Sequence, residues 1–161
     1  MNLFRRRFTR TSDHAFGVRI SDEERDLLEH LIPQLRDLLM ATSPTGEVDP
    51  AARRLFPTAY NEDEDDESTY QELMRDQLLA ARLDSLDRFE ATVRSEELSE
   101  DDIEAWMNCI NQVRLVLGTR LDVSEEDDPS DMDPDDPDTV PLATYHYLGH
   151  LLGEILDVRM R

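Results

Sequence analysis

The residues best suited to chemistry in this chain are two histidines and a glutamate near its C-terminal end. His146, His150 and Glu154 follow one another at intervals of four residues, which places all three on one face of an α-helix. Two imidazoles and a carboxylate in that arrangement can ligate a divalent metal ion. A hydrolytic zinc helix carries an acid directly after its first histidine, and this segment has a tyrosine there. We therefore favour surface histidines, with a metal-binding or enzymatic helical module as the alternative.

The only cysteine, Cys109, is the redox candidate. It lies about 80° from the centre of the apolar stripe of its predicted helix. A buried thiol at that position would be inert, with a raised pKa, and this is the interpretation we favour. The alternative is a peripheral thiol that joins two chains in a disulfide-linked homodimer, because one cysteine cannot form a disulfide within the chain.

Charge supplies a further set of candidates. The chain carries a net charge of −21, and all 17 of its basic residues are arginines. A field of that sign repels phosphate backbones and favours basic partners. Arg5, Arg6 and Arg7, followed by Arg10, could grip a phosphate backbone. The acidic remainder opposes DNA, so we do not expect direct DNA binding by the chain alone and expect these arginines to be solvated or paired with its own acid.

Two acidic runs, Glu62–Glu67 and Asp122–Asp138, are too densely charged to pack, and we expect both to be solvated, with 122–138 a flexible loop. Docking onto a basic protein is the sharper alternative, because opposite charge speeds encounter. The candidates within the second run are Glu125, Glu126, Asp127 and Asp128. The sequence has no nucleophile–base pair, no glycine-rich phosphate loop and no cysteine cluster, so we predict no enzyme and no cofactor.

The elements that position these residues are predicted to be mainly helical. A chain of 161 residues fits a single domain, 1–161. No apolar run approaches the length of a membrane span and no signal peptide is recognisable, which favours a cytoplasmic protein. Residues 1–20 are expected to form a hairpin or arm, with two short strands around the polar turn Ser12–His14. The fold class is therefore all-α, a bundle of four main helices with a short N-terminal β-hairpin.

Capping boxes predict where two of the helices begin, at Ser21–Glu24 and Ser68–Gln71, and Ser99–Asp102 is predicted to cap the third. Pro33 should kink the first helix. The second is expected over 69–94, supported by the ion pairs Asp84–Arg88 and Glu90–Arg94. A single helical turn is expected over Asp49–Leu55. The residues expected to face the core in the first and second helices are Leu27, Leu28, Leu31, Leu35, Leu38 and Leu39, then Leu73, Leu79, Leu83, Leu86 and Val93.

The third helix contains the only tryptophan and is predicted to form the centre of the core, with Trp106, Ile110, Val113 and Leu117 on one face together with Ile103. Arg114 lies beside that stripe and is expected to pair with carboxylates. The fourth helix is expected over 140–159, with Gly149 and Gly153 allowing another helix to approach. Its inward residues are predicted to be Leu142, Tyr145, Leu148, Leu152, Ile155 and Leu156.

Three segments, Leu55–Tyr60, Trp106–Leu121 and Tyr145–Gly149, together resemble an actinobacterial family of domains of unknown function that includes the oxidative-stress-responsive regulator AosR. The resemblance extends from about residue 18 to the C-terminus. It implies a non-enzymatic cytoplasmic regulator that acts with a protein partner, a sigma factor, in the response to oxidants. This sequence departs from a sensor that closes an internal disulfide, because Cys109 is alone.

Overall fold

The computed structural model describes residues 5–41, 64–122, 130 and 133–161, with the backbone alone for 64–72. The predictions for Asp49–Leu55, Leu55–Tyr60 and Glu125–Asp128 lie outside these residues. Along the chain the elements are β1 (Phe8–Ser12), β2 (Ala15–Val18), α1 (Asp22–Met40), α2 (Glu64–Thr92), β3 (Glu97–Ser99), α3 (Glu100–Leu121) and α4 (Thr139–Arg159).

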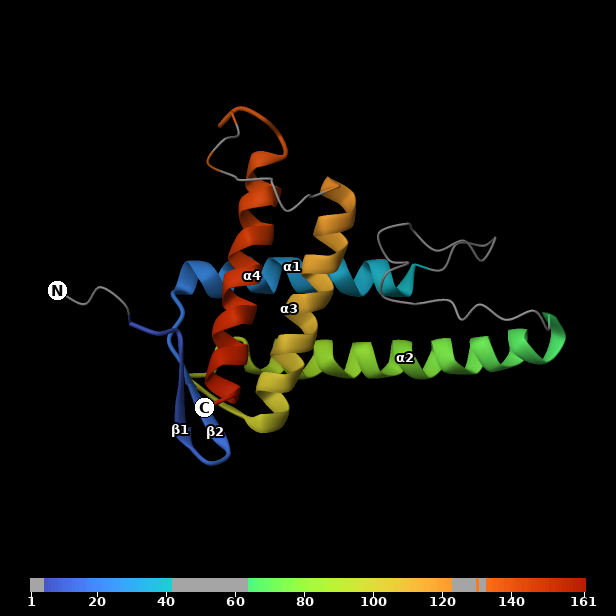
Figure 1. Ribbon diagram of the computed structural model, residues 1–161, viewed down its shortest axis with the longest axis horizontal. Coiled ribbons are helices and arrows are strands. Elements are labelled where there is room, and N and C mark those ends of the chain that lie inside the picture. The colour runs from blue at the N-terminus through green and yellow to red at the C-terminus, as the bar shows by residue number, and fades with distance from the viewer. Residues whose placement is uncertain (1–4, 42–63, 123–129, 131–132) are drawn as a thin grey trace.

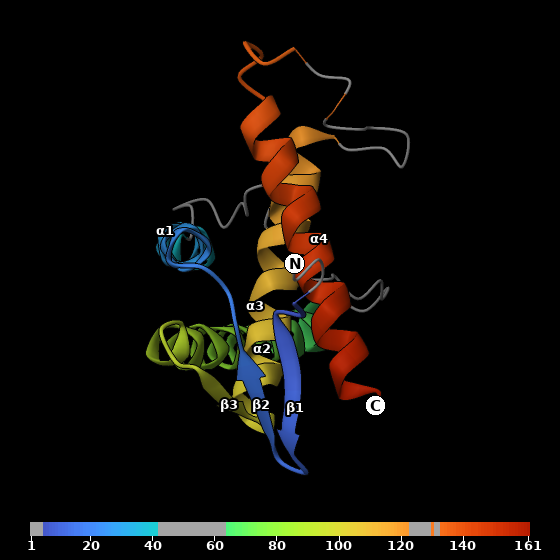
Figure 2. The ribbon, with the colours of Figure 1, turned by 90° about the vertical axis from the view of Figure 1, so that its left-hand side faces the viewer.

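The four helices form two crossed layers. α3 and α4 lie side by side, and α1 and α2 run across them (Figure 1). Turned by 90°, the molecule shows α1 and α2 end-on and the strands gathered beside the start of α3 (Figure 2). The predicted fold class, four main helices with a short β-structure at the N-terminus, is confirmed. No helix in the described ranges is long and apolar enough to cross a membrane.

The predicted hairpin is present but belongs to a larger sheet. β1 and β2 pair antiparallel, Phe8 opposite Val18, and β2 pairs on its other side with β3. β3 has only three residues, too few for an alternating pattern to be recognised in the sequence. Its pairing joins the hairpin to the start of α3 and so fixes the sheet against the helices.

The core is centred on Trp106, as predicted. Its side chain is completely buried, with the Phe8 ring edge-on at 6.1 Å and the Phe89 ring at 4.7 Å between centroids. The indole Nε1–H donates to the Thr92 hydroxyl over 2.9 Å, which satisfies the one polar atom of a buried tryptophan. Three elements distant in sequence, β1, α2 and α3, therefore meet at one side chain.

The capping box predicted at Ser21 and the cap predicted at Ser99 are confirmed. The Ser21 hydroxyl accepts from the Glu24 amide, and Ser99 makes the same contact with Asp102 at the start of α3. The box at Ser68 is wrong, because α2 begins at Glu64 and Ser68 lies inside it. Residues 64–67 are therefore helical rather than a solvated loop. Acidic side chains suit the positive end of a helix dipole, so the run can open the helix.

Several predicted inward positions are corrected by tertiary packing. Leu73 is 55% exposed and Leu156 is 44% exposed. Val116 is buried where Leu117 was expected, and Leu117 is only partly buried against the core. A helical stripe gives the direction of a side chain, but the neighbouring elements decide how far along the helix that stripe is covered.

The ion pairs predicted within α2 are also replaced by pairs between elements. Arg88 pairs with Asp102 of α3, and Arg94 pairs with Asp26 and Glu29 of α1. These contacts tie α2 to both of its neighbours. Pro33 lies inside α1, and the kink predicted there stays a prediction.

Candidate functional site

The predicted metal ligands do not form a ligand set. Glu154 is engaged by Arg7, whose Nη1 donates to Oε1 over 2.7 Å and whose backbone amide donates to Oε2 over 3.2 Å. The His146 ring stacks edge-on against Tyr145, and His150 is exposed. Among the residues that the structure describes, no group of three histidine, cysteine, aspartate or glutamate side chains is placed to hold a metal ion. The i, i+4 spacing is real, but its carboxylate has another partner.

Arg7 forms a junction between three parts of the chain. Its Nε donates to Glu24 of α1 over 2.8 Å, and its Nη1 reaches Glu154 of α4. The guanidinium also lies 5.9 Å from the centre of the Tyr147 ring. Burial raises the pKa of Glu24, but the Ser21 amide and the Arg7 guanidinium outweigh it, and the pKa falls below its usual value. This arginine is part of the fold and is not free for a ligand.

The basic N-terminal patch is divided by the fold. Phe8 is buried in the core, and Arg10 packs over the Phe16 ring at 4.8 Å and donates to the backbone of Asp13. Arg5 and Arg6 remain exposed. Arg7 is held by Glu24 and Glu154, and Arg10 lies on Phe16, so the arginines do not act as one phosphate-binding unit.

Cys109 lies within the core, with no exposed surface. Burial raises the pKa of its thiol to about 12, slightly moderated by Arg36. The thiolate is the reactive form, and a side chain enclosed in this way is not presented to a second chain. The structure thus favours the buried interpretation over the disulfide-linked dimer.

Two glycines, one on each of α3 and α4, make a reciprocal contact that the sequence did not reveal. The Tyr145 ring lies against Gly118, and the Arg114 side chain lies against Gly149. A Cβ added at either glycine would approach its neighbour to 3.1 or 3.2 Å. Arg114 stacks over Tyr145 at 4.7 Å, and no carboxylate in the described part of the chain pairs with it, contrary to the prediction. Gly149 therefore has its predicted packing role, whereas Gly153 faces open space.

A groove of about 820 Å³ lies where the outer face of the sheet meets the start of α1. It falls within the roughly 300–1,000 Å³ typical of small-molecule sites. The residues that line it are Arg5, Thr9, Thr11, Gly17, Val18, Arg19, Ile20, Ser21, Asp22, Arg25, Arg94, Glu96 and Glu97. Four arginines, three acidic side chains and several hydroxyl groups thus meet at one place.

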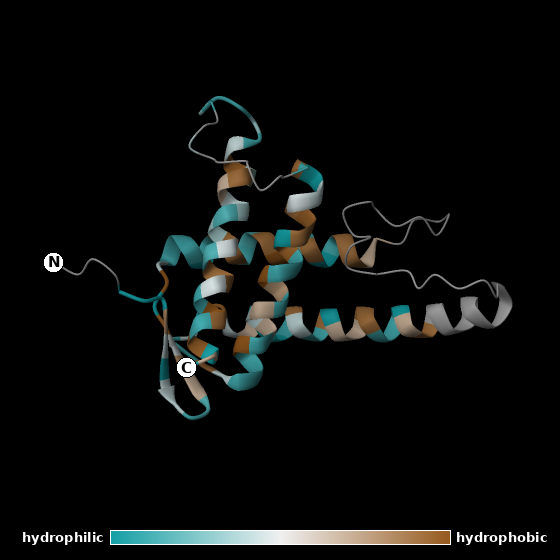
Figure 3. Cartoon of the chain, viewed as in Figure 1, coloured by the Kyte–Doolittle hydropathy of each residue, from teal (hydrophilic) through white to brown (hydrophobic). Residues whose placement is uncertain are grey.

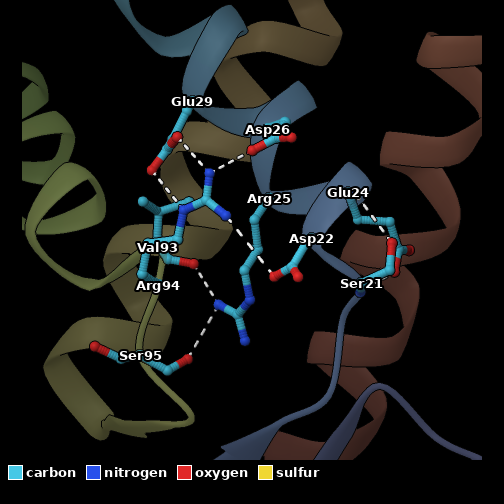
Figure 4. A network of polar contacts seen from close by, with 9 residues as sticks. All are labelled: Ser21, Asp22, Glu24, Arg25, Asp26, Glu29, Val93, Arg94 and Ser95. Atoms are coloured by element: carbon cyan, nitrogen blue, oxygen red, sulfur yellow. Dashed lines mark hydrogen bonds and ion pairs between the residues drawn. The ribbon is translucent and has the colours of Figure 1, made fainter.

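Arg25 is the residue of this groove that the sequence interpretation missed. It is only 6% exposed, and its Nη1 donates to the backbone carbonyls of Val93 and Ser95 at the end of α2 (Figure 4). A signal for it was present. Arg25 continues the buried stripe of α1, three residues before Leu28, which in turn precedes Ile32. A charged residue in an apolar stripe indicates a buried, hydrogen-bonded cation.

Comparison with known proteins identifies a family without an assigned activity. A family model described as a domain of unknown function, DUF2017, matches residues 5–158. No curated protein and no solved structure matches the chain.

Proposed function

We propose that this chain, which belongs to the DUF2017 family of domains of unknown function, is a non-enzymatic cytoplasmic regulator that acts by binding a basic protein partner. The observation that carries the proposal is the net charge of −21. A surface of that charge repels nucleic acid, attracts basic proteins and accelerates their encounter.

Internal ion pairs direct many of the positive charges toward the chain's own carboxylates. Such pairs hold Arg7, Arg10, Arg36, Arg88, Arg94, Arg159 and Arg161. Within the described ranges, carboxylates without an ion pair, such as Asp37, Asp84 and Asp101, are exposed. The arginines that could compete for the exposed carboxylates are already in ion pairs within the chain. These carboxylates would therefore be available to a basic partner.

The distal segment of α2, which we define as residues 73–80, is the surface we assign to that partner. α2 continues past α3 (Figure 1), and apolar residues continue along this segment (Figure 3). Leu73 is 55% exposed and Met74 is 45% exposed. The same helix opens with the acidic residues 64–67. Apolar contact beside an acidic helix end suits a basic partner with an apolar patch, because each property supplies a separate part of the binding energy.

The family resemblance extends the proposal to the partner's identity. The segments Trp106–Leu121 and Tyr145–Gly149 resemble regulators of the oxidative-stress response that act with a sigma factor, and a DNA-binding sigma factor has a basic surface. Because Cys109 is enclosed in the core, we place oxidant sensing outside this thiol. The chain would then respond to a change in its partner or in its own abundance.

The test is binding to purified sigma factors of the source organism, measured by calorimetry over a series of salt concentrations. We expect binding that weakens as salt rises, and a further weakening of about tenfold in the double variant Leu73→Ser, Met74→Ser. Val140→Ser, which removes a side chain that is 74% exposed on α4, is the matched control and should bind as the wild type does. Binding that is insensitive to both salt and the double variant would contradict the proposal.

A further inference from the structure

We propose that the groove between the sheet and α1 binds a small multivalent oxyanion, carrying phosphate or carboxylate groups, on the free edge of Arg25. This site is separate from the protein-binding surface on α2 and does not depend on it. The proposed regulator binds a protein through its acidic surface. This groove would add a second input, from a small charged molecule.

The hydrogen bonds of Arg25 occupy only one side of its guanidinium. Nη1 donates to the carbonyls of Val93 and Ser95, and no hydrogen bond or ion pair within the described part of the chain involves Nε or Nη2. Figure 4 shows both of these nitrogens on the side turned away from the two carbonyls. The Nε–Nη2 edge of a guanidinium presents two parallel N–H groups, which is the geometry that a carboxylate or phosphate accepts in bidentate fashion.

Arg25 is a buried cation without a carboxylate partner, which is unusual because burying a charge is costly unless it is paired. The carboxylates that follow or precede it along α1 are directed elsewhere. Arg94 pairs with Asp22, Asp26 and Glu29. The two backbone carbonyls, which follow the last residue of α2, supply partial negative charge and hold the guanidinium in a fixed orientation. Arg94 therefore engages the α1 carboxylates that would otherwise be available to Arg25.

Other groups around the groove fit the same ligand class. Arg5 and Arg19 are exposed, and their side chains have no ion-pair partner among the described residues. Thr9 adds a hydroxyl on β1. Gly17 leaves the outer face of β2 open, since a Cβ there would lie 3.0 Å from the Thr9 hydroxyl oxygen. Asp22, Glu96 and Glu97 also line the groove, and the attraction of the arginines has to exceed the repulsion of an anion by these carboxylates.

The test uses sodium pyrophosphate and sodium citrate as probes of the phosphate and carboxylate forms of this chemistry. Each is titrated into the full chain at constant ionic strength, by calorimetry and by thermal unfolding. We expect one of the two to bind and to raise the melting temperature, because a ligand that binds only the folded state stabilises it. Arg19→Gln should weaken that binding about tenfold, the loss expected for a charge-assisted hydrogen bond.

Arg161→Gln is the matched control, because Arg161 is an exposed arginine at the end of the chain, outside both the groove and the protein-binding surface. It removes the same charge and should bind the probe as the wild type does. Equal weakening in both variants would show a general charge effect and overturn the site, as would the absence of binding by either probe at millimolar concentration. Sigma-factor binding is measured separately, with the Leu73 and Met74 double variant. A failure of anion binding would therefore leave the proposed function standing, and a failure of sigma-factor binding would leave the anion site standing.

Discussion

Arg7 and Arg25 both contact neighbouring elements beside the first turn of α1, but the groups that balance their charges differ. Arg7 contacts Glu24 and Glu154, so its charge is matched by two carboxylates. Arg25, the residue after Glu24, is more deeply buried and is matched by backbone carbonyls alone. Both hold elements together. Only the second keeps its whole Nε–Nη2 edge without a hydrogen-bond partner among the described residues, and such an edge beside a groove is what a ligand can recognise.

The largest effect should come from removing the buried arginine. Arg25→Ala leaves the carbonyls of Val93 and Ser95 without their donor, which should cost about 3 kcal/mol of unfolding free energy. Arg7→Ala should cost about 1–2 kcal/mol, because Glu24 and Glu154 are partly exposed and can turn to water. Urea denaturation measures both. A larger loss of unfolding free energy for Arg7→Ala than for Arg25→Ala would contradict this order. Arg75→Ala is the control and should stay within about 0.5 kcal/mol of wild type.

Acid should weaken the Arg7 junction. The pKa of Glu24 lies below its ordinary value, so its contribution to stability is complete above that ordinary value and is lost as the pH falls through the folded-state pKa. Between about pH 7 and about pH 3, the wild type should lose more stability than Glu24→Gln, which has no proton to gain at this position. Thermal unfolding across that pH range measures the loss of stability in both proteins. Equal losses would show that the Arg7 contact does not lower the pKa of Glu24.

The smallest effect concerns a third arginine, Arg114, which stacks on Tyr145 and lies against Gly149. Gly149→Ala should destabilise the chain by about 1 kcal/mol, because the added methyl group approaches Arg114 Nε to 3.2 Å. Gly153→Ala meets nothing within 4 Å and should stabilise α4 by about 0.5–1 kcal/mol through helix propensity alone. Thermal melts of the two variants should move in opposite directions, and a shift of the same sign in both would remove the packing role assigned to Gly149.

Local signals predicted much of the architecture. The serine caps at Ser21 and Ser99 and the tryptophan stripe of α3 were predicted correctly, because each depends on residues within one or two turns of one another. The failures occurred where distant segments compete. Ser68 lost its capping role to an acidic run upstream, and Leu73 is exposed because no other helix or strand in the described ranges covers it.

The candidate sites were harder to predict for the same reason. Spacing alone put His146, His150 and Glu154 on one face, but Arg7, 147 residues before Glu154, takes the carboxylate. The angle of Cys109 on its helix could not show that Arg36 and Glu90 from two other helices lie close enough to affect the pKa of its thiol. The groove at Arg25 is built from all three strands, α1 and the end of α2, and no local pattern describes such a place.

By itself the sequence determined a helical, strongly acidic chain organised around Trp106, because periodicity, capping and net charge are properties that neighbouring residues carry with them. Only the tertiary structure decided which charges are matched. An ion pair depends on segments brought together by folding, and this fold gives Arg7 two carboxylates while directing those nearest Arg25 to Arg94.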